Sequence, residues 1–538
     1  MGIRNSSSQF HHEEVGLHAP HPRYDRRMDT KLLYQAPDAS ATPLLAIFAV
    51  DFATSKDSLP APVLLTSSNA IATAASRVLA SGEFKASLGE SAILHAPAGL
   101  AAERLILIGL GKAKSLSLDE LRKGAGAAVR AAKPRGIREV VIAFPELKAI
   151  PGKSFHAVQI ARVLSEGAAL ADTDYDTYKS DRKDLSVYSA ALLIPESLHH
   201  FGSDIETGLN EGVILANAQN FTRSIVNEPG NVLTPTTLGQ RTAAMCAEIG
   251  LKCEVYSTEK LHELKMGAFW AVSQGSAEPP ALIVMTYEPP VPPRPHSPVF
   301  GLVGKGITFD TGGISIKPAD GMEKMKYDMA GAGAMIGAMR AIAQLKPPVK
   351  VISVICSAEN MPDGKAFKPG DVVTAMSGKT IEIVNTDAEG RLVLSDGLHY
   401  AKTLGCTHLI NAATLTGAVA IALGKLNVGL FSNNDETTQK FLDGLALSGE
   451  KYWRLPCTDD YRDQIKSQIA DIQNTGITRY GGSITAAMFL KEFVGDTPWI
   501  HLDIAAMAWN DEQTAWLAKG PSGIGVRSIV EWVRSYAH

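Results

Sequence analysis

One turn, Asn385–Leu392, most constrains what this chain can fold into. The residues before it, Thr380–Val384, are short and rich in β-branched side chains, which favours a strand. The residues after it place Leu394, Leu398 and Ala401 at helical spacing. The turn is therefore predicted to join the carboxyl end of a strand to the amino end of a helix, the edge where open α/β sheets bind ligands.

Three charged residues in this turn suggest chemistry. Asp387 and Glu389 are two residues apart, so their carboxylates can converge on one cation. Arg391 follows after two more residues, and its guanidinium can bind an anion beside that cation. A solvated turn with an acidic helix start has the same composition, so the turn alone leaves both interpretations open.

A glycine-rich stretch upstream, Gly304–Gly313, adds to the same edge. It follows the strand-like segment Val299–Val303, and we expect Lys305 and Asp310 to lie beside Asp387. A phosphate-binding loop is the first alternative, because glycines let the backbone approach a bound group. The spacing does not fit G-x-x-x-x-G-K-[ST], and no serine or threonine follows Lys305.

Further along the chain, Asp328 precedes the helix-like segment Ala330–Leu345. As a single residue it is an ordinary helix N-cap. With Asp310, Asp387 and Glu389 it makes a set of four carboxylates at predicted element ends, which would repel and raise one another's pKa. Two divalent cations remove that conflict, and oxygen-rich sites suit magnesium, manganese or zinc. Aminopeptidases, phosphatases and nucleases use such metal pairs.

The length of 538 residues predicts more than one domain. Residues 30–205 alternate strand-like and helix-like segments, as in an α/β domain, and include a predicted helix over Leu118–Ala132 with Ser117 and Glu120 as a capping box. We expect a linking helix over residues 206–226 within a second domain of residues 206–538. The polar residues 1–29 are expected to form a disordered tail.

Composition narrows the partners and the compartment. The formal net charge of −4 gives no reason to expect a nucleic-acid binder. Five cysteines without a C-x-x-C pair favour a reducing, cytoplasmic location over a disulfide framework. No stretch has the apolar length needed to cross a bilayer.

These motifs resemble those of the leucyl aminopeptidase family, the two-metal cytosolic exopeptidases. Asn385–Leu392 has the form of that family's signature, and the resemblance is dense from about Asn227 to Val526. His501–Ala505 is similar, with Ala506 where we expect glycine. Further matching stretches are Gly304–Asp310, Thr311–Gly313, Ser315–Pro318, Met325–Gly331, Asn411–Gly417 and Arg479–Gly482.

The resemblance implies a metal-dependent aminopeptidase that releases leucine and other, mainly apolar, residues from peptides with a free amino terminus. A water or hydroxide bridging two divalent ions, Mn²⁺ or Zn²⁺ and also Mg²⁺, would attack the peptide. In this family pattern Asp310 and Glu389 would bridge the metals, Asp387 would hold one, and Lys305 and Asp328 would hold the other.

The resemblance also implies roles for other residues. Lys317 would polarise the scissile carbonyl, and Arg391 would bind a bicarbonate ion acting as general base. Leu415 would contact the substrate through its backbone. The pocket for the first side chain would be lined by Met325, Thr414, Gly417, Ala505 and Ala508.

For the architecture, the resemblance implies a small N-terminal α/β domain similar to macro domains. A larger C-terminal α/β catalytic domain with a central mixed sheet would follow, and the subunits would form homohexamers as dimers of trimers. Two alternatives use the same residues or surface. One is a two-metal phosphoesterase, and the other is a hexameric DNA-binding scaffold, which the acidic net charge does not favour.

Overall fold

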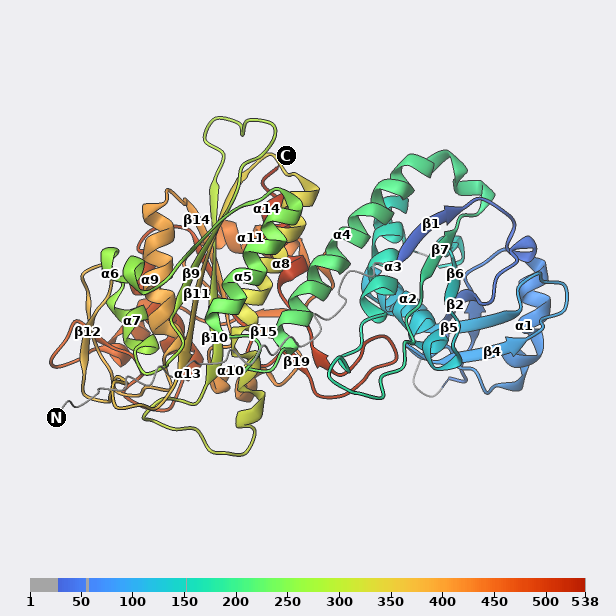
Figure 1. Ribbon diagram of the computed structural model, residues 1–538. Coiled ribbons are helices and arrows are strands. Elements are labelled where there is room, and N and C mark those ends of the chain that lie inside the picture. Colours follow the sequence, from blue (N-terminus) through green and yellow to red (C-terminus); the bar gives the residue numbers. More distant parts are fainter. Residues whose placement is uncertain (1–27, 55–57, 151, 538) are drawn as a thin grey trace, which may run out of the picture.

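The computed structural model describes residues 28–54, 58–150 and 152–537. Figure 1 shows two α/β lobes joined by one long helix, α4 (Gly202–Asn227). The predicted disordered tail, residues 1–29, lies almost wholly outside the described residues. Among those residues, we find no helix with both the length and the hydrophobicity needed to cross a membrane.

The N-terminal lobe is built on a seven-stranded sheet with the order β1-β7-β6-β2-β5-β4, and β3 pairs with β2. Helices α2 (Leu118–Ala132) and α3 (Ala157–Ala171) pack on one face, and α1 (Asn69–Ser81) packs on the other. The strands are β1 (Asp29–Leu33), β2 (Leu45–Asp51), β3 (Pro62–Leu64), β4 (Ser91–His95), β5 (Arg104–Lys112), β6 (Glu139–Ala143) and β7 (Ser189–Leu193).

Local sequence signals fix several of these elements. Helix α2 has the predicted bounds, and Ser117 and Glu120 form the predicted capping box at its start. The first strand of the lobe, β1, pairs in parallel with β7. The link to the second lobe, α4, is longer than the predicted residues 206–226 by four residues at its start and one at its end.

The C-terminal lobe is built on an eight-stranded mixed sheet with the order β16-β15-β18-β14-β10-β11-β9-β8. Its strands are β8 (Lys252–Tyr256), β9 (Ala281–Tyr287), β10 (Val299–Asp310), β11 (Lys350–Asn360), β14 (His408–Ala413), β15 (Val428–Ser432), β16 (Tyr452–Arg454) and β18 (Trp499–Asp503). Strands β11, β10, β14 and β18 run parallel to their neighbours in that order, so their carboxyl ends meet at one edge.

Helices cover both faces of this sheet (Figure 1). One face packs against α4, α5 (Pro235–Ile249), α8 (Ala330–Leu345) and α14 (Val526–Arg534). The other packs against α7 (Gly267–Ser273), α9 (Gly390–Thr403) and α13 (Gly482–Val494). Helix α8 has its predicted bounds and connects the parallel strands β10 and β11, which confirms the predicted β-α-β unit.

Two expectations about the functional edge were wrong in detail. Strand β10 does not stop at Val303 but continues to Asp310, so Lys305 lies within the strand and Asp310 at its end. The segment before the key turn, β13 (Thr380–Glu382), does not belong to the main sheet. It forms a small separate sheet with β12 (Val372–Thr374) and β17 (Ile472–Gln473).

Candidate active site

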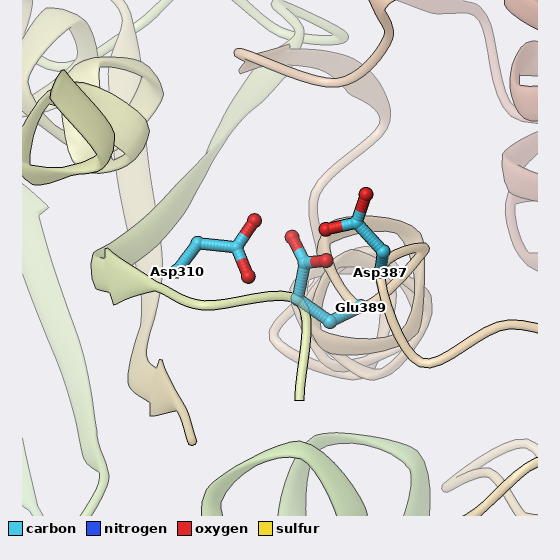
Figure 2. Close-up of side chains that lie close together, drawn as sticks. All are labelled: Asp310, Asp387 and Glu389. Carbon is cyan, nitrogen blue, oxygen red and sulfur yellow. The ribbon is translucent and has the colours of Figure 1, made fainter. Parts of the chain in front are cut away.

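Three carboxylates converge where β10 ends and α9 begins. Asp310 closes β10, while Asp387 and Glu389 stand in the irregular segment directly before α9. One oxygen from each carboxylate lies within 4.8 Å of the other two. Figure 2 shows the three carboxyl groups directed toward one another, so they can share a cation.

Two glycines allow this close approach of chain segments. A Cβ at Gly390 would lie 2.7 Å from the Lys305 Cδ and Cε atoms, so only glycine lets that side chain pass the start of α9. Gly312 has φ +87°, and a Cβ there would lie 2.6 Å from the Ser315 carbonyl oxygen and 3.0 Å from the Asp387 Oδ1 atom. The loop after β10 can therefore fold tightly against Asp387.

A buried lysine extends the cluster to a fourth carboxylate. The Lys305 Nζ atom lies 2.9 Å from Asp328 Oδ2 and 2.8 Å from Glu389 Oε1. It also donates to the Thr414 carbonyl oxygen at 2.9 Å. Asp328 does not cap α8, whose N-cap is Met329. Its Oδ1 atom instead accepts a hydrogen bond from the Thr414 hydroxyl at 2.7 Å, so the N-cap interpretation of Asp328 is wrong.

A second lysine lies on the open side of the cluster. The Lys317 Nζ atom is 2.8 Å from Asp310 Oδ2 and 2.5 Å from Asp387 Oδ1. Its side chain is 21% exposed, against 3% for Lys305, so it lies nearer the solvent. Burial would lower the pKa of Lys317, but Asp310, Glu389 and Asp328 outweigh that effect and raise it.

The four carboxylates remain short of positive charge despite the two lysines. Burial raises the pKa of Asp328 to about 8, and Asp310 and Glu389 add to that shift. Burial and the neighbouring Asp310 also raise the pKa of both Asp387 and Glu389. The buried Glu389 Oε2 atom finds no hydrogen-bond partner in the described part of the chain. This donor set fits divalent cations, which would bring the missing charge.

Two asparagines and a threonine that the sequence motifs did not single out brace this cluster. Asn360, at the end of β11, donates to Asp310 Oδ1 at 2.9 Å and to the Thr386 carbonyl at 3.1 Å. The Thr386 hydroxyl donates to the Gly312 carbonyl at 2.6 Å. Asn474 binds the turn through Asn385. One feature could have pointed to Asn360, namely its position at the end of a strand whose neighbour ends at Asp310.

Arg391 lies in the first turn of α9 and is 7% exposed. It donates from Nη1 to the Asn474 carbonyl at 2.8 Å. Its Nε atom has no hydrogen-bond partner among the residues described. Burial lowers the pKa of Arg391 to about 10, although Glu389 and Asp503 act in the opposite direction. The guanidinium therefore remains charged at neutral pH and retains an unused donor.

The cluster opens into a cavity of about 1020 Å³. All the residues predicted to act at the site line it except Ala508, which is 2% exposed and packs in the core. Its neighbour Ala506, where we expected glycine, does line the cavity. The predicted residues on its wall are Lys305, Asp310, Lys317, Met325, Asp328, Asp387, Glu389, Arg391, Thr414, Leu415, Gly417 and Ala505.

Other parts of the wall come from residues to which the sequence analysis assigned no role. Residues 475–479 line the cavity, and so do Lys324, Lys425, Trp509 and Asp511. Tyr480, which follows that segment, is 73% exposed. Only the folded chain brings these segments to the cavity, because they lie up to 206 residues from the first site residue, Lys305, along the sequence (511 − 305).

Comparisons with known proteins agree with this geometry. The family model described as "Cytosol aminopeptidase family, catalytic domain" matches residues 220–530. The model for the N-terminal domain of the same family matches residues 52–182. The match to the catalytic domain contains every residue of the carboxylate cluster.

Relatives with curated names cover nearly the whole chain. A probable cytosol aminopeptidase of Acidobacterium capsulatum is 59% identical over 502 residues, which is 92% of this chain and 97% of the relative. A protein with the same description from Koribacter versatilis is 58% identical, covering 93% of this chain and 98% of the relative.

Solved structures share the architecture. The bottromycin maturation enzyme BotP in complex with Mn has a TM-score of 0.79 and 34% sequence identity, covering 93% of this chain and 100% of that one. A mutant of tomato leucine aminopeptidase has a TM-score of 0.81 and 31% identity, covering 94% of this chain and 96% of that one.

Proposed function

The chain belongs to the cytosol aminopeptidase family and is a metal-dependent aminopeptidase, and from that premise we propose how its own residues act. We propose that it removes leucine and other, mainly apolar, residues from peptides with a free amino terminus. The observation that carries this proposal is the cluster of Asp310, Asp387 and Glu389, which opens into a large cavity. Family membership selects this interpretation over a phosphoesterase or a DNA-binding scaffold.

We assign the metal-holding role to five residues. Asp310 and Glu389 lie at the centre of the cluster and are suited to bridging, with Asp387 on the side of Lys317. Lys305 and Asp328 lie together on the other side. When bound, two divalent cations such as Mn²⁺, Zn²⁺ or Mg²⁺ activate the attacking water and polarise the substrate.

Lys305 must give up a proton to act as a ligand. Burial would lower its pKa, but Asp328, Glu389 and Asp310 outweigh burial and raise it, so the side chain carries its proton beside bare carboxylates. A dication held by the same carboxylates reverses that balance, because positive charge disfavours the ammonium. The hydrogen bond to the Thr414 carbonyl keeps the Nζ atom in place.

Lys317 and Arg391 serve the reaction and not the neutrality of the site. Lys317 is the more exposed lysine, and its ammonium can donate to the carbonyl oxygen of the scissile bond as negative charge develops there. Arg391 has an unused Nε donor beside the cavity, which suits a planar anion such as bicarbonate. That anion would accept the proton of the attacking water.

The test compares leucine p-nitroanilide with its N-acetyl form, first with Mn²⁺ and then with EDTA. We expect hydrolysis of the free substrate only, and its loss in EDTA, because an acetyl group would keep the substrate amine from the metal and Asp328. Equal cleavage of both substrates would overturn the requirement for a free amino terminus. Activity that survives exhaustive chelation would overturn the metal assignment.

Three further features are part of the proposal. We propose a homohexamer assembled through the C-terminal lobe and a cytoplasmic location, in line with the description of the relatives as cytosol aminopeptidases. We also propose that residues 30–205 form the N-terminal domain and residues 206–538 the catalytic domain. Light scattering that found an active monomer would contradict the hexamer.

A further inference from the structure

A buried carboxylate beside the cavity has no role in the chemistry described above. Asp503 ends strand β18 and is 0% exposed. Its Oδ1 atom accepts hydrogen bonds from the backbone N–H groups of Leu415 at 3.2 Å and Thr416 at 3.4 Å, and also from Ala505 N–H at 3.3 Å. Its Oδ2 atom accepts from the Thr416 hydroxyl at 2.6 Å. The Asp503 side chain therefore binds three donors of one chain segment, which are the two N–H groups of Leu415 and Thr416 and the Thr416 hydroxyl.

That segment, residues 414–417, joins β14 to helix α10 (Gly417–Leu423) and lines the cavity. On its other side, the Lys305 ammonium donates to the Thr414 carbonyl and the Thr414 hydroxyl donates to Asp328. The Thr416 hydroxyl, while donating to Asp503, also accepts from Val419 N–H at 3.2 Å and so caps α10. The segment is thus held between the carboxylate cluster and Asp503.

Because peptide units are planar, these contacts also determine the direction of the Leu415 carbonyl, which Asp503 does not contact. A trans peptide unit is planar, so its N–H and the preceding C=O point in opposite directions. When Asp503 accepts from the Thr416 N–H, the carbonyl of Leu415 must point away from Asp503. In the same way, the bond to the Leu415 N–H directs the Thr414 carbonyl away from Asp503 and toward Lys305, as observed.

We propose that Asp503 is a positioning residue that turns the Leu415 carbonyl toward the substrate. This inference rests on the proposed function, in which the Leu415 backbone contacts the peptide. A carbonyl can only accept a hydrogen bond, and near the scissile bond a peptide offers its terminal amine and the N–H of the scissile amide. Because the metal and Asp328 take the amine, the Leu415 carbonyl receives the amide N–H.

A carboxylate is the side chain that these contacts require. An asparagine at position 503 has one acceptor oxygen, and its NH₂ group would face either the backbone N–H donors or the Thr416 hydroxyl. In the first orientation the N–H groups of Leu415 and Thr416 lose their acceptor. In the second they keep only a neutral amide oxygen, which binds N–H groups more weakly than a carboxylate, so either orientation holds the two peptide units less firmly. Asp503→Asn therefore tests the hydrogen bonds with almost no change in volume.

The experiment compares Asp503→Asn with Asp396→Asn in the full-length, Mn²⁺-loaded enzyme. Asp396, on α9, is a matched control: it is also 0% exposed and also accepts backbone N–H groups, from Phe269 at 2.9 Å and Met376 at 2.7 Å. Its donors lie away from residues 414–417. The substrates are leucyl-glycine and the matching ester of leucine with glycolic acid, which lacks the N–H of the scissile amide.

We expect Asp503→Asn to lower kcat/KM for the peptide by about tenfold more than for the ester, because only the peptide loses a hydrogen bond. Metal content should stay at the wild-type level, and Asp396→Asn should affect both substrates equally. Equal losses on peptide and ester in Asp503→Asn would overturn the proposal. A wild-type enzyme that cleaves neither substrate would instead overturn the proposed function.

A second variant keeps the test decisive if Asp503→Asn does not fold. Thr416→Val retains the shape of the side chain and removes the hydroxyl that binds Asp503 Oδ2. The same selective loss on the peptide, smaller at about threefold, is expected because the N–H bonds from Leu415 and Thr416 to Asp503 remain. A loss that is equal on both substrates would contradict the positioning role of Asp503.

Discussion

Two buried charge clusters in this molecule differ in how fully the chain itself neutralises their carboxylates. Between the lobes, the Glu166 carboxylate lies 2.7 Å from Arg122 Nε and 2.6 Å from Arg527 Nη1. Burial would raise its pKa, but Arg122, Arg527 and Arg162 outweigh burial and lower it. In the active site four carboxylates share two lysines, and the pKa values of Asp328, Asp387 and Glu389 are raised.

The contrast separates a structural role from a functional one. The cations around Glu166 come from the chain itself, from α2 in the N-terminal lobe and α14 in the C-terminal lobe, so the cluster fastens the lobes together. The active-site carboxylates are folded into place without enough positive charge of their own. The repulsion among these carboxylates is relieved when cations bind, and this relief favours binding. A salt bridge differs from such a metal site because the chain itself supplies its positive charge.

The largest effect should come from Glu389→Gln, which removes a carboxylate from the centre of the metal cluster. We expect the activity to fall by at least about 10⁴-fold, or about 5 kcal/mol in the activation barrier, because the water is no longer activated. Metal content, measured by elemental analysis, should fall too. In EDTA the variant should be no less stable than the wild type, because repulsion is relieved. Full metal occupancy with full activity would contradict the assignment of Glu389.

Glu166→Gln should give the opposite pattern, with lost stability and intact chemistry. Removing the carboxylate leaves two buried arginines without their shared partner, which should cost about 3–5 kcal/mol of the free energy of unfolding. Chemical denaturation measures that loss. Metal content and kcat per folded molecule should not change, because the cluster lies between the lobes. A loss of metal in this variant would show that the two clusters are coupled.

The two clusters also differ in how far the sequence could predict them. All four active-site carboxylates follow from motifs at predicted element ends, and Asp310, Asp387 and Glu389 do converge. Glu166 could not be found in this way, because it lies inside α3 and acquires Arg527 as a partner only when residues 361 positions apart meet. A short motif carries its own local geometry, whereas an interlobe contact depends on the whole fold.

The same distinction explains the errors near the active site. Strand β10 was predicted too short because its three glycines, typical of loops, are used instead for close packing: a Cβ at Gly304 would lie 2.7 Å from the Ala332 Cα atom. β-strand propensity placed residues 380–384 in a strand but could not decide which sheet they join. Residues 475–478 of the cavity wall carry no motif or periodic pattern, so only the tertiary structure reveals them.

Lys317→Ala separates charge neutralisation from catalysis within the active site. Once metals are bound, this lysine is not needed to neutralise the carboxylates that hold them. Loss of a donor to the developing oxyanion costs about 2.7–4 kcal/mol, so kcat should fall roughly 10²–10³-fold. Metal content and melting temperature should remain near the wild-type values. If Lys317 only braces the loop after β10, the variant will lose metal or stability together with activity, and those two measurements would reveal it.

The smallest effect concerns a buried titratable group that belongs to neither cluster. His501 on β18 is 0% exposed, and its Nδ1 atom accepts a hydrogen bond from Asn411 Nδ2 at 2.8 Å. Its ring stacks on Phe431 and Trp499. Burial, helped by Arg391, lowers the pKa of His501 to about 3. The imidazole is therefore neutral in the folded protein throughout the neutral and mildly acidic range.

The sign of the pH effect follows from the unfolded chain, where a histidine titrates near pH 6.5. Below that pH the unfolded state binds a proton that the folded state refuses, so stability falls as the pH decreases toward 3. The slope is about 1.4 kcal/mol per pH unit. His501→Gln cannot titrate, so its free energy of unfolding in EDTA should fall less steeply than that of the wild type between pH 6 and pH 4.5. Parallel slopes would show that the folded protein accommodates a protonated imidazole beside Arg391, and would contradict the lowered pKa of His501.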